Sequence, residues 1–292
     1  MRTPSQGAAV ALMAAAALMW SIAGVVTRQL ESTPPFEATF WRSLFAGLTV
    51  LVGLGFTHGR AAWRSILSSG RPGLLTGASF AVMYVCFMVA LTMTTVAHTL
   101  LVSALAPLFT ALLARAAVGH HVPPRTWIAI AAAFAGMTWM FAPALSADEP
   151  RHALGMAIAL GVPLAAAVND VTLSHAGPRF DLVPAVLLGA VASALVVLPM
   201  SLPFSATLHD IALLALLGIV QLGLPCMMLV IAARALSAPE IALLGLIEVV
   251  AGPLWAWLGA GEVPARETLW GGAVVLAALA ANEYAALRGK RG

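Results

Sequence analysis

The chain has 292 residues, of which 61% are hydrophobic and 9% are charged, with a formal net charge of +3. A soluble domain carries roughly 25% charged residues, so this composition excludes an ordinary soluble protein and predicts a membrane protein. The small, scattered positive charge also excludes a nucleic-acid-binding surface. Two cysteines, Cys86 and Cys226, lie inside apolar stretches and indicate neither a disulfide framework nor a metal site.

The sequence divides into apolar segments separated by short polar or Pro/Gly-rich connectors, which leave no room for a soluble domain. Each segment is close to the ~20 residues that cross a hydrocarbon core as a helix. The first has no clear cleavage site, so we interpret it as a retained helix and not as a signal peptide. The ten predicted spans are residues 8–28, 36–56, 72–92, 95–118, 124–142, 153–174, 182–201, 209–232, 238–259 and 267–287.

The basic residues predict the orientation. Alternating the spans across the bilayer places most connecting lysines and arginines on the side that holds both ends of the chain. Lysine and arginine are enriched on the cytoplasmic side of membrane proteins. We therefore expect a multi-pass protein of a bacterial-type cytoplasmic (inner) membrane, with both termini in the cytoplasm.

An internal repeat is visible in the fourth and ninth spans. Residues 104–120 can be laid over residues 246–262 without a gap, at an offset of 142 residues, close to half the chain. Five spans would then repeat as five spans, and because five is odd the second copy must enter the membrane from the opposite side. This pattern predicts two inverted five-helix repeats, at residues 1–147 and 148–292, an arrangement typical of secondary transporters.

Several motifs resemble those of the EamA branch of the drug/metabolite transporter superfamily. The first two spans contain LMWSIAGVVTRQL and PPFEATFWRSLFAGL, the fourth contains PLFTALLARAAVGH, and the ninth carries Glu248 and the Gly261–Glu262 pair. The sequence departs from the family pattern at Val249, where proline is usual; Pro253 follows four residues later. The resemblance covers all ten spans. It implies an all-α bundle of ten helices around a central cavity that exports small metabolites, most similar to the YddG-type amino-acid exporters.

The depth of each side chain along its span singles out a set near the bilayer midplane. At a rise of 1.5 Å per residue, Trp20, Tyr84, Gln221 and Glu248 each lie about 15–18 Å into their spans. A charge at this depth costs about 2.5–3.5 kcal/mol on insertion scales, which makes Glu248 a functional candidate. It shares a helical face with glycines, so a buried structural role that hydrogen-bonds another helix is the alternative to proton coupling or binding of an ammonium group. The substrate-binding candidates are Trp20, Met83, Tyr84, Ser103, Gln221 and Glu248.

Prolines and polar residues elsewhere in the spans predict kinks and gates. A proline inside a helix removes one backbone donor, so Pro225 should free the carbonyl of Gln221. The expected kinks are at Pro107, Pro163, Pro225 and Pro253. Four polar side chains nearer the span ends are candidates for a gate or a cavity mouth. The alternatives are anchoring, capping or solvation and, for Arg42, direct contact with the substrate. The four side chains are those of Arg42, His98, Asn169 and Asp170.

The leading functional hypothesis is export of amino acids, aromatic or of broad range, by alternating access. Aromatic faces attract cations, which suits the ammonium group of an amino acid or an aromatic dication. The alternatives are therefore an exporter of cationic aromatic drugs or other metabolites, and a non-transporting membrane subunit. The motifs of serine hydrolases, zinc proteases and metal-diphosphate enzymes do not occur in the sequence. We expect no enzymatic activity, cofactor, metal or nucleic-acid partner, and leave the oligomeric state open.

Overall fold

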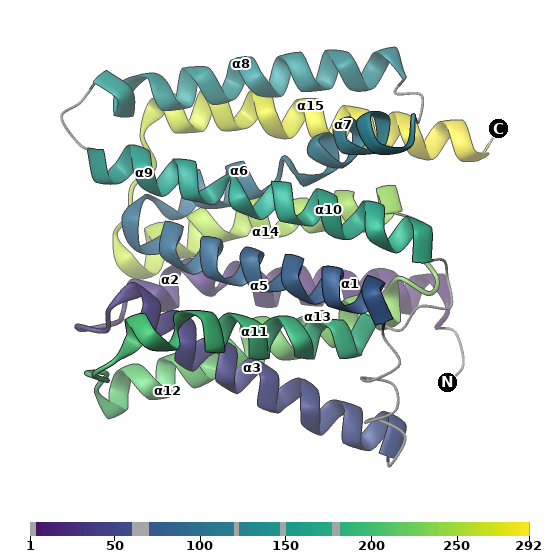
Figure 1. The fold of residues 1–292 in the computed structure, drawn as a ribbon. Helices are drawn as coiled ribbons and strands as arrows, with labels where there is room; N and C mark the ends of the chain where they lie inside the picture. The colour runs from purple at the N-terminus through teal and green to yellow at the C-terminus, as the bar shows by residue number, and fades with distance from the viewer. Residues whose placement is uncertain are drawn as a thin grey trace.

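The computed structural model describes residues 4–59, 70–119, 123–146, 150–176, 182–236 and 238–291. These residues form an all-helical bundle, with no strand among them. The helices lie side by side along a common direction, and α1 begins and α15 ends at the same end of the bundle (Figure 1). The expected boundary between the two halves, at residues 147 and 148, lies outside the described residues.

The first half of the chain contains seven labelled helices. They are α1 (Gln6–Ser21), α2 (Ala23–Thr27), α3 (Pro35–His58), α5 (Gly70–Met93), α6 (Val96–Ser103), α7 (Ala106–Val118) and α8 (Pro124–Ser146). The described residues of the second half are also helical. Its elements are α9 (Pro150–Ala159), α10 (Gly161–Ala176), α11 (Leu182–Ser201), α12 (Leu208–Leu216), the π-helix η2 (Leu217–Gly223), α13 (Leu224–Ala232), α14 (Ala238–Ala260) and α15 (Arg266–Arg291).

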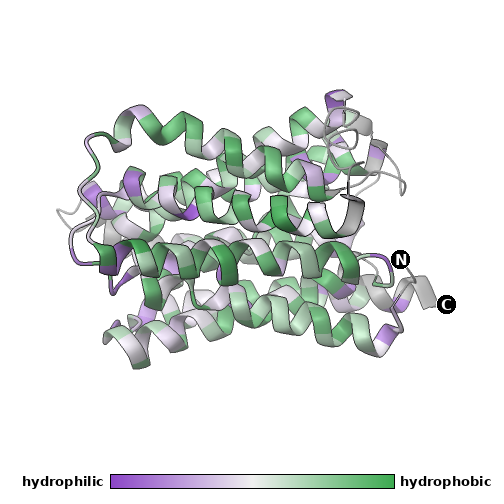
Figure 2. Cartoon of the chain, turned by 90° about the horizontal axis from the view of Figure 1, so that it is seen from below, coloured by the Kyte–Doolittle hydropathy of each residue, from purple (hydrophilic) through white to green (hydrophobic). Residues whose placement is uncertain are grey.

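Eight helical stretches are long and apolar enough to cross a membrane, in a search of the described residues. They are formed by α1 with α2, α3, α5, α6 with α7, α9 with α10, α11, α12 through α13, and α14. Helices α8 and α15 occupy the places of the fifth and tenth predicted spans but are not among these eight. Hydrophobic residues run along the helices, while hydrophilic residues gather toward the two ends of the bundle (Figure 2). The protein is therefore a multi-pass membrane protein.

Within the described residues, four of the spans are interrupted along their length. The first breaks at Ile22, the fourth after Ser103 and the sixth at Leu160, and the eighth changes to π-helical hydrogen bonding at Leu217. Pro107, Pro163 and Pro225 each lie within the first three residues of the helix that follows such a change. The first amides of a helix have no intrahelical acceptor, so proline is tolerated there. In contrast, α14 continues past Pro253.

The helices pack in a recurring pattern. Helix α11 packs against α3 and α5, and α15 packs against α8 at one edge of the bundle. Helix α1 lies against α13 and α14, while α10 lies against α5 and α7. A buried cluster that includes Phe87, Leu100, Leu217 and Val249 joins α5, α6, η2 and α14 in the interior. The unbroken helices α5 and α14 therefore pack in the interior against parts of the broken fourth and eighth spans.

The glycine face of α14 is tightly packed at one end and open at the other. A Cβ atom on Gly252 would lie 2.2 Å from Leu100 Cδ1, and one on Gly259 would lie 2.5 Å from Val25 Cγ2. A Cβ atom on Gly245 would meet nothing within 4 Å. Small residues let helices approach closely in membranes, so this face holds α2 and α6 against one half of α14. Glu248 lies between the closed and the open part.

Candidate functional site

The Arg42 guanidinium is buried in the interior, where it contacts Gln221. Arg42 and Gln221 are each only 2% exposed. Arg42 Nε and Nη2 donate to Gln221 Oε1 at 3.1 and 2.9 Å. Arg42 Nη1 is also buried, but it has no hydrogen-bond partner in the structure. Arg42 was predicted as a gate or an anchor, or as a direct substrate contact; the structure places its head group beside Gln221, one of the substrate-binding candidates.

The local structure of η2 explains how Gln221 reaches Arg42. Gln221 lies inside the π-helix, whose wider turns change the direction of side chains relative to an α-helix. Gly218, in the same segment, lies against α3: a Cβ atom there would be 2.6 Å from the carbonyl oxygen of Arg42 and 2.5 Å from Phe45 Cβ. The backbones of η2 and α3 thus approach each other closely, which brings the two side chains together.

Aromatic rings and a backbone carbonyl complete the surroundings of this pair. The guanidinium carbon of Arg42 lies 5.6 Å from the ring centre of Phe87 and 6.0 Å from that of Tyr84, within the range of cation–π attraction. Gln221 Nε2 donates to the carbonyl oxygen of Trp20 at 3.3 Å, next to the break between α1 and α2. We call Trp20, Arg42, Tyr84, Phe87 and Gln221 the Arg42 cluster.

Glu248 lies near this cluster but outside its hydrogen bonds. It is half-buried on α14, and it accepts no hydrogen bond from any residue that the structure describes. Its carboxylate and the Arg42 guanidinium are close enough to interact electrostatically, yet they form no ion pair within 4.0 Å. Residues 241–248 are all half-buried, which fits the open space beside Gly245. Opposite charges therefore face the same region without contact.

The other candidates on the fourth and sixth spans do not join the Arg42 cluster. Ser103 is half-buried and donates to the carbonyl of Thr99, in its own helix, at 2.8 Å. Asn169 is buried, and its Oδ1 has no hydrogen-bond partner within the described part of the chain. Asp170 is exposed and accepts a hydrogen bond from Thr110 at 3.0 Å, which joins α10 to α7.

Two more residues of α5 and α13 border the Arg42 cluster. Met83 is partly buried and packs in a cluster with Tyr84, Leu222 and Cys226. The Tyr84 hydroxyl lies 4.0 Å from Cys226 Sγ. Sequence reasoning treated Cys226 only as an apolar residue and did not single out Phe87. Met83, Leu222 and Cys226, which pack with Tyr84, therefore form a largely apolar surface on one side of the Arg42 cluster.

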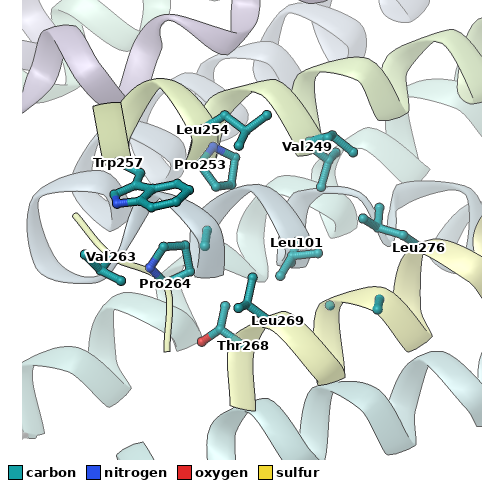
Figure 3. Close-up of a pocket in the computed structure, with 14 residues that line it drawn as sticks. Leu101, Val249, Pro253, Leu254, Trp257, Val263, Pro264, Thr268, Leu269 and Leu276 are labelled. Carbon is teal, nitrogen blue, oxygen red and sulfur yellow. The ribbon is translucent and has the colours of Figure 1, made fainter. Parts of the chain in front are cut away.

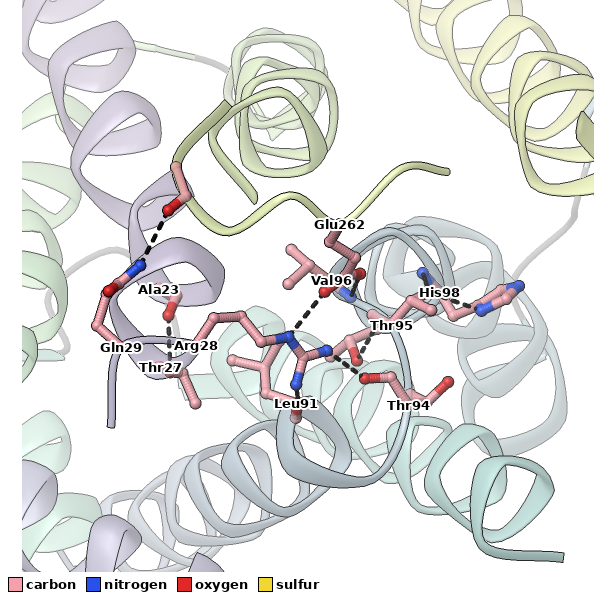
Figure 4. A network of polar contacts seen from close by, with 12 residues as sticks. Ala23, Thr27, Arg28, Gln29, Leu91, Thr94, Thr95, Val96, His98 and Glu262 are labelled. Atoms are coloured by element: carbon pink, nitrogen blue, oxygen red, sulfur yellow. Dashed lines mark hydrogen bonds and ion pairs between the residues drawn. The ribbon is translucent and has the colours of Figure 1, made fainter. Parts of the chain in front are cut away.

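A second polar network closes one end of the bundle (Figure 4). Arg28 Nε and Glu262 Oε2 form an ion pair at 2.7 Å. Arg28 also donates to the carbonyl oxygens of Leu91 and Thr94, at 2.8 and 2.7 Å. Glu262 Oε1 accepts from the backbone amide of Val96 at 2.6 Å. This Arg28 network joins α2, the end of α5, the start of α6 and the end of α14.

His98 extends the Arg28 network toward α9 and α15. It is buried, and its Nδ1 lies 2.7 Å from Thr95 Oγ1 and 3.2 Å from His152 Nε2. Its Nε2 lies 3.2 Å from Thr268 Oγ1, at the start of α15. Thr95 also caps α6 by accepting from the His98 amide at 3.1 Å. His98 is thus a cross-linking residue in this structure and not a solvated one.

Two buried acids bind loops at the same end. Glu37 accepts from the backbone amides of Ser205 and Ala206 at 2.9 to 3.0 Å. Asp210 accepts from the amides of Glu31 and Ser32, at 3.0 and 3.3 Å. Carboxylates that accept backbone amide bonds hold loop conformations firmly, since charge-assisted bonds are short and strong. The Arg28 end is therefore extensively hydrogen-bonded, with its loops held against α3 and α12.

A pocket of about 350 Å³ lies between α6, α14 and α15 (Figure 3). Its walls are apolar, and the hydroxyl of Thr268 is its main polar group. Trp257, Leu254 and Leu269 line it and are 49%, 46% and 58% exposed. It contains none of the predicted substrate-binding side chains, although the kink candidate Pro253 lines it. Without a charged group it offers nothing to recognise a polar solute, and its exposed apolar walls suit contact with lipid.

Comparison with known proteins finds a family match for the first half of the chain and a similar fold. Residues 7–142, just under half of the chain, match the EamA-like transporter family. A solved crystal structure has a similar fold, with a TM-score of 0.68 and 19% sequence identity, covering 97% of this chain and 99% of that one. A comparison with curated proteins finds no match. The family match thus covers the first five predicted spans, and the likeness to the solved structure concerns the fold.

Proposed function

We propose that this protein exports amino acids across a bacterial-type inner membrane by alternating access. The observation that carries the proposal is the Arg42 cluster, a buried set of polar and aromatic side chains where helices are broken. Polar groups inside a membrane bundle are costly and are found at substrate pathways. Transporter sites also lie at interrupted helices near the midplane. The cluster offers donors, an amide and aromatic faces, which suit a small zwitterion with an apolar side chain.

Two inverted five-helix repeats, residues 1–147 and 148–292, supply the moving parts in this proposal. Helix pairs related by the repeat pack alike: α1 on α14 corresponds to α10 on α7, and α5 on α11 to η2 on α3. Tyr84 and Cys226, which lie side by side, are 142 residues apart, the same offset as the repeated sequence motif. Related positions that touch are expected near a two-fold axis, which supports a site between the halves.

The two ends of the bundle differ in a way that favours one conformation of the cycle. All residues of α6 except Ser103 are buried, and the Arg28 network closes that end. Toward the other end, residues 241–248 of α14 and 109–114 of α7 are all half-buried. With both termini in the cytoplasm, this second end faces the cytoplasm. We therefore interpret the structure as closed to the outside and accessible from the inside.

A counterflow assay tests the substrate class. The purified chain is reconstituted in liposomes that are loaded with one unlabelled amino acid, and uptake of a panel of labelled amino acids is followed. Saturable uptake above that of protein-free liposomes is expected, strongest for large apolar or aromatic side chains. Uptake equal to that of the protein-free liposomes for every amino acid would refute the proposal.

A rival cargo is favoured by one observation, the acid Glu248, which lies near the Arg42 cluster and accepts no hydrogen bond from the described residues. An aromatic dication would be drawn to this charge. The buried cation Arg42 opposes it, because like charges repel in a site of low dielectric constant. Counterflow of an aromatic dication without counterflow of amino acids would establish the rival. Absence of both fluxes would favour a non-transporting subunit.

A further inference from the structure

We propose that Arg42 binds the carboxylate of the transported substrate and that Glu248 binds its ammonium group. The inference rests on the proposed function and narrows it. The substrate would need both charged groups of an α-amino acid, and amines, amides and simple acids would be excluded. Gln221 would act as a positioning residue that holds Arg42 without neutralising it.

The hydrogen bonds of Arg42 leave one edge of the guanidinium available. A guanidinium has five N–H donors in a planar fork. The two bonds to Gln221 Oε1 use Nε and one hydrogen of Nη2, along one edge. The edge between Nη1 and Nη2 remains, and Nη1 has no hydrogen-bond partner among the residues that the structure describes. This edge has the geometry that binds a carboxylate through two parallel hydrogen bonds.

Arg28 provides a comparison within the same protein, because its guanidinium binds only protein groups that hold the helices together. Its three nitrogens bind Glu262 and the carbonyl oxygens of Leu91 and Thr94. Its charge is balanced by an acid, although its side chain is 27% exposed. Arg42 is more deeply buried, at 2%, and its hydrogen bonds go only to a neutral amide. A buried cation with an unpaired edge and no acid in contact is explained if a substrate provides the missing anion.

The surroundings hold the free edge in place. Gln221 is fixed at its other end by the bond from Nε2 to the Trp20 carbonyl. The rings of Phe87 and Tyr84 lie beside the guanidinium and limit its movement. A site in which the binding group is already oriented loses less entropy when the ligand arrives. The cluster therefore has the preorganisation expected of a carboxylate site.

Glu248 supplies the second half of the recognition. It interacts electrostatically with Arg42 without contact, so the two charges are separated by more than an ion-pair distance. Val249, the next residue, packs in the same buried cluster as Phe87, which places this part of α14 beside the Arg42 cluster. A zwitterion lying between the two groups would satisfy both charges, whereas a molecule with one charge would leave the other unpaired in a region of low dielectric constant.

The experiment compares four competitors that share one side chain. They are the best amino acid of the counterflow panel, its carboxamide, its decarboxylated amine, and the acid that lacks the amino group. With wild-type protein, we expect each of the three analogues to compete at least about tenfold less well than the amino acid, because each leaves a buried charge unpaired. An analogue series needs no variant, so it decides the question even if a variant fails to fold.

Three variants test which residues cause the preference for the amino acid over its carboxamide. In Arg42→Gln the amino acid and its carboxamide should compete to within about twofold, since the cation that distinguishes them is gone. Gln221→Glu places an acid against Arg42 and should reduce the same preference. Arg115→Gln is the matched control, because Arg115 is exposed and also lies over an aromatic ring, Trp127 at 5.6 Å. It should keep the wild-type preference, and equal melting temperatures would show that the variants are folded.

The outcomes separate this inference from the proposed function. If wild-type protein shows amino-acid counterflow but the carboxamide competes as well as the amino acid, Arg42 is not the carboxylate site and the export function stands. A folded Arg42→Gln protein that keeps the wild-type preference leads to the same conclusion. If no amino acid shows counterflow at all, both proposals fail.

Discussion

Replacing Glu262 with glutamine should open the end of the bundle that the Arg28 network closes. Glutamine keeps the shape of glutamate but removes its charge, and its single amide oxygen cannot serve both Arg28 and the Val96 amide. A hydrogen bond to a charged group contributes about 1.5–3 kcal/mol, and an exposed ion pair about 0–1 kcal/mol. The side chains of Arg28 and Glu262 are 27% and 18% exposed, an intermediate case. We estimate about 1–2 kcal/mol, which corresponds to a factor of roughly 5–30 in the ratio of closed to open protein.

Thiol labelling measures this change. A cysteine replaces Ser103, at the break after α6, in a protein in which Cys86 and Cys226 are alanine. A membrane-impermeant maleimide is added from the side of the Arg28 network. Labelling from that side should be about 5–30-fold faster in Glu262→Gln than in its parent, because the rate follows the population of the open conformation. Arg28→Gln should have a similar effect, and the double variant should add little to either.

Glu267→Gln is the matched control for this experiment. Glu267 lies five residues further on, at the start of α15, and is exposed. Its replacement removes the same charge at the same end without breaking the Arg28 network. Equal labelling rates in Glu262→Gln and Glu267→Gln would show that the network does not hold this end closed.

Three further predictions concern single residues. Gly218→Ala should destabilise the protein by about 1–3 kcal/mol and weaken transport, because its Cβ would collide with the α3 backbone at Arg42; Gly245→Ala, which meets no atom, is the control in thermal unfolding. Glu248→Gln should lower amino-acid counterflow and change its pH dependence; unchanged flux and pH dependence would leave Glu248 a structural role only. Trp255→Phe should cost about 0.5–1.5 kcal/mol of stability, since Trp255 Nε1 donates to Ser21 Oγ at 3.0 Å; an unchanged melting temperature would contradict this.

Hydropathy and length were enough to place eight of the ten predicted spans, as far as the described residues show. Apolar segments of bilayer length stand out without knowledge of their neighbours, and the described helices fall where such segments were predicted. The breaks before Pro107, Pro163 and Pro225 follow from a local property, the missing amide of proline. The break at Ile22 has no such marker. It coincides with contacts between distant segments, such as Trp255 with Ser21 and Val96 against Gly24.

The partners within the candidate site could not be predicted for related reasons. Counting residues from the end of each span placed Arg42 closer to the membrane surface than Gln221. The two long side chains nevertheless reach each other and form a hydrogen bond. The π-helix that carries Gln221 has no periodic signature in the sequence. Gly218 and Gly223 lie within it and Pro225 follows it, but these residues do not predict π-helical hydrogen bonding. Arg28 and Glu262 lie 234 residues apart, so only the parallel packing of the first span on α14 brings them together.

Counterflow of labelled amino acids in proteoliposomes, with and without a pH gradient, decides whether the Arg42 cluster belongs to an amino-acid exporter. We predict saturable uptake above that of protein-free liposomes, which is lost in a folded Gln221→Leu protein because the Arg42 cluster is broken. A change of rate with the pH gradient would add proton coupling, while equal rates would indicate facilitated exchange. Uptake equal to that of protein-free liposomes for every amino acid, or full uptake by Gln221→Leu, would contradict the proposed function.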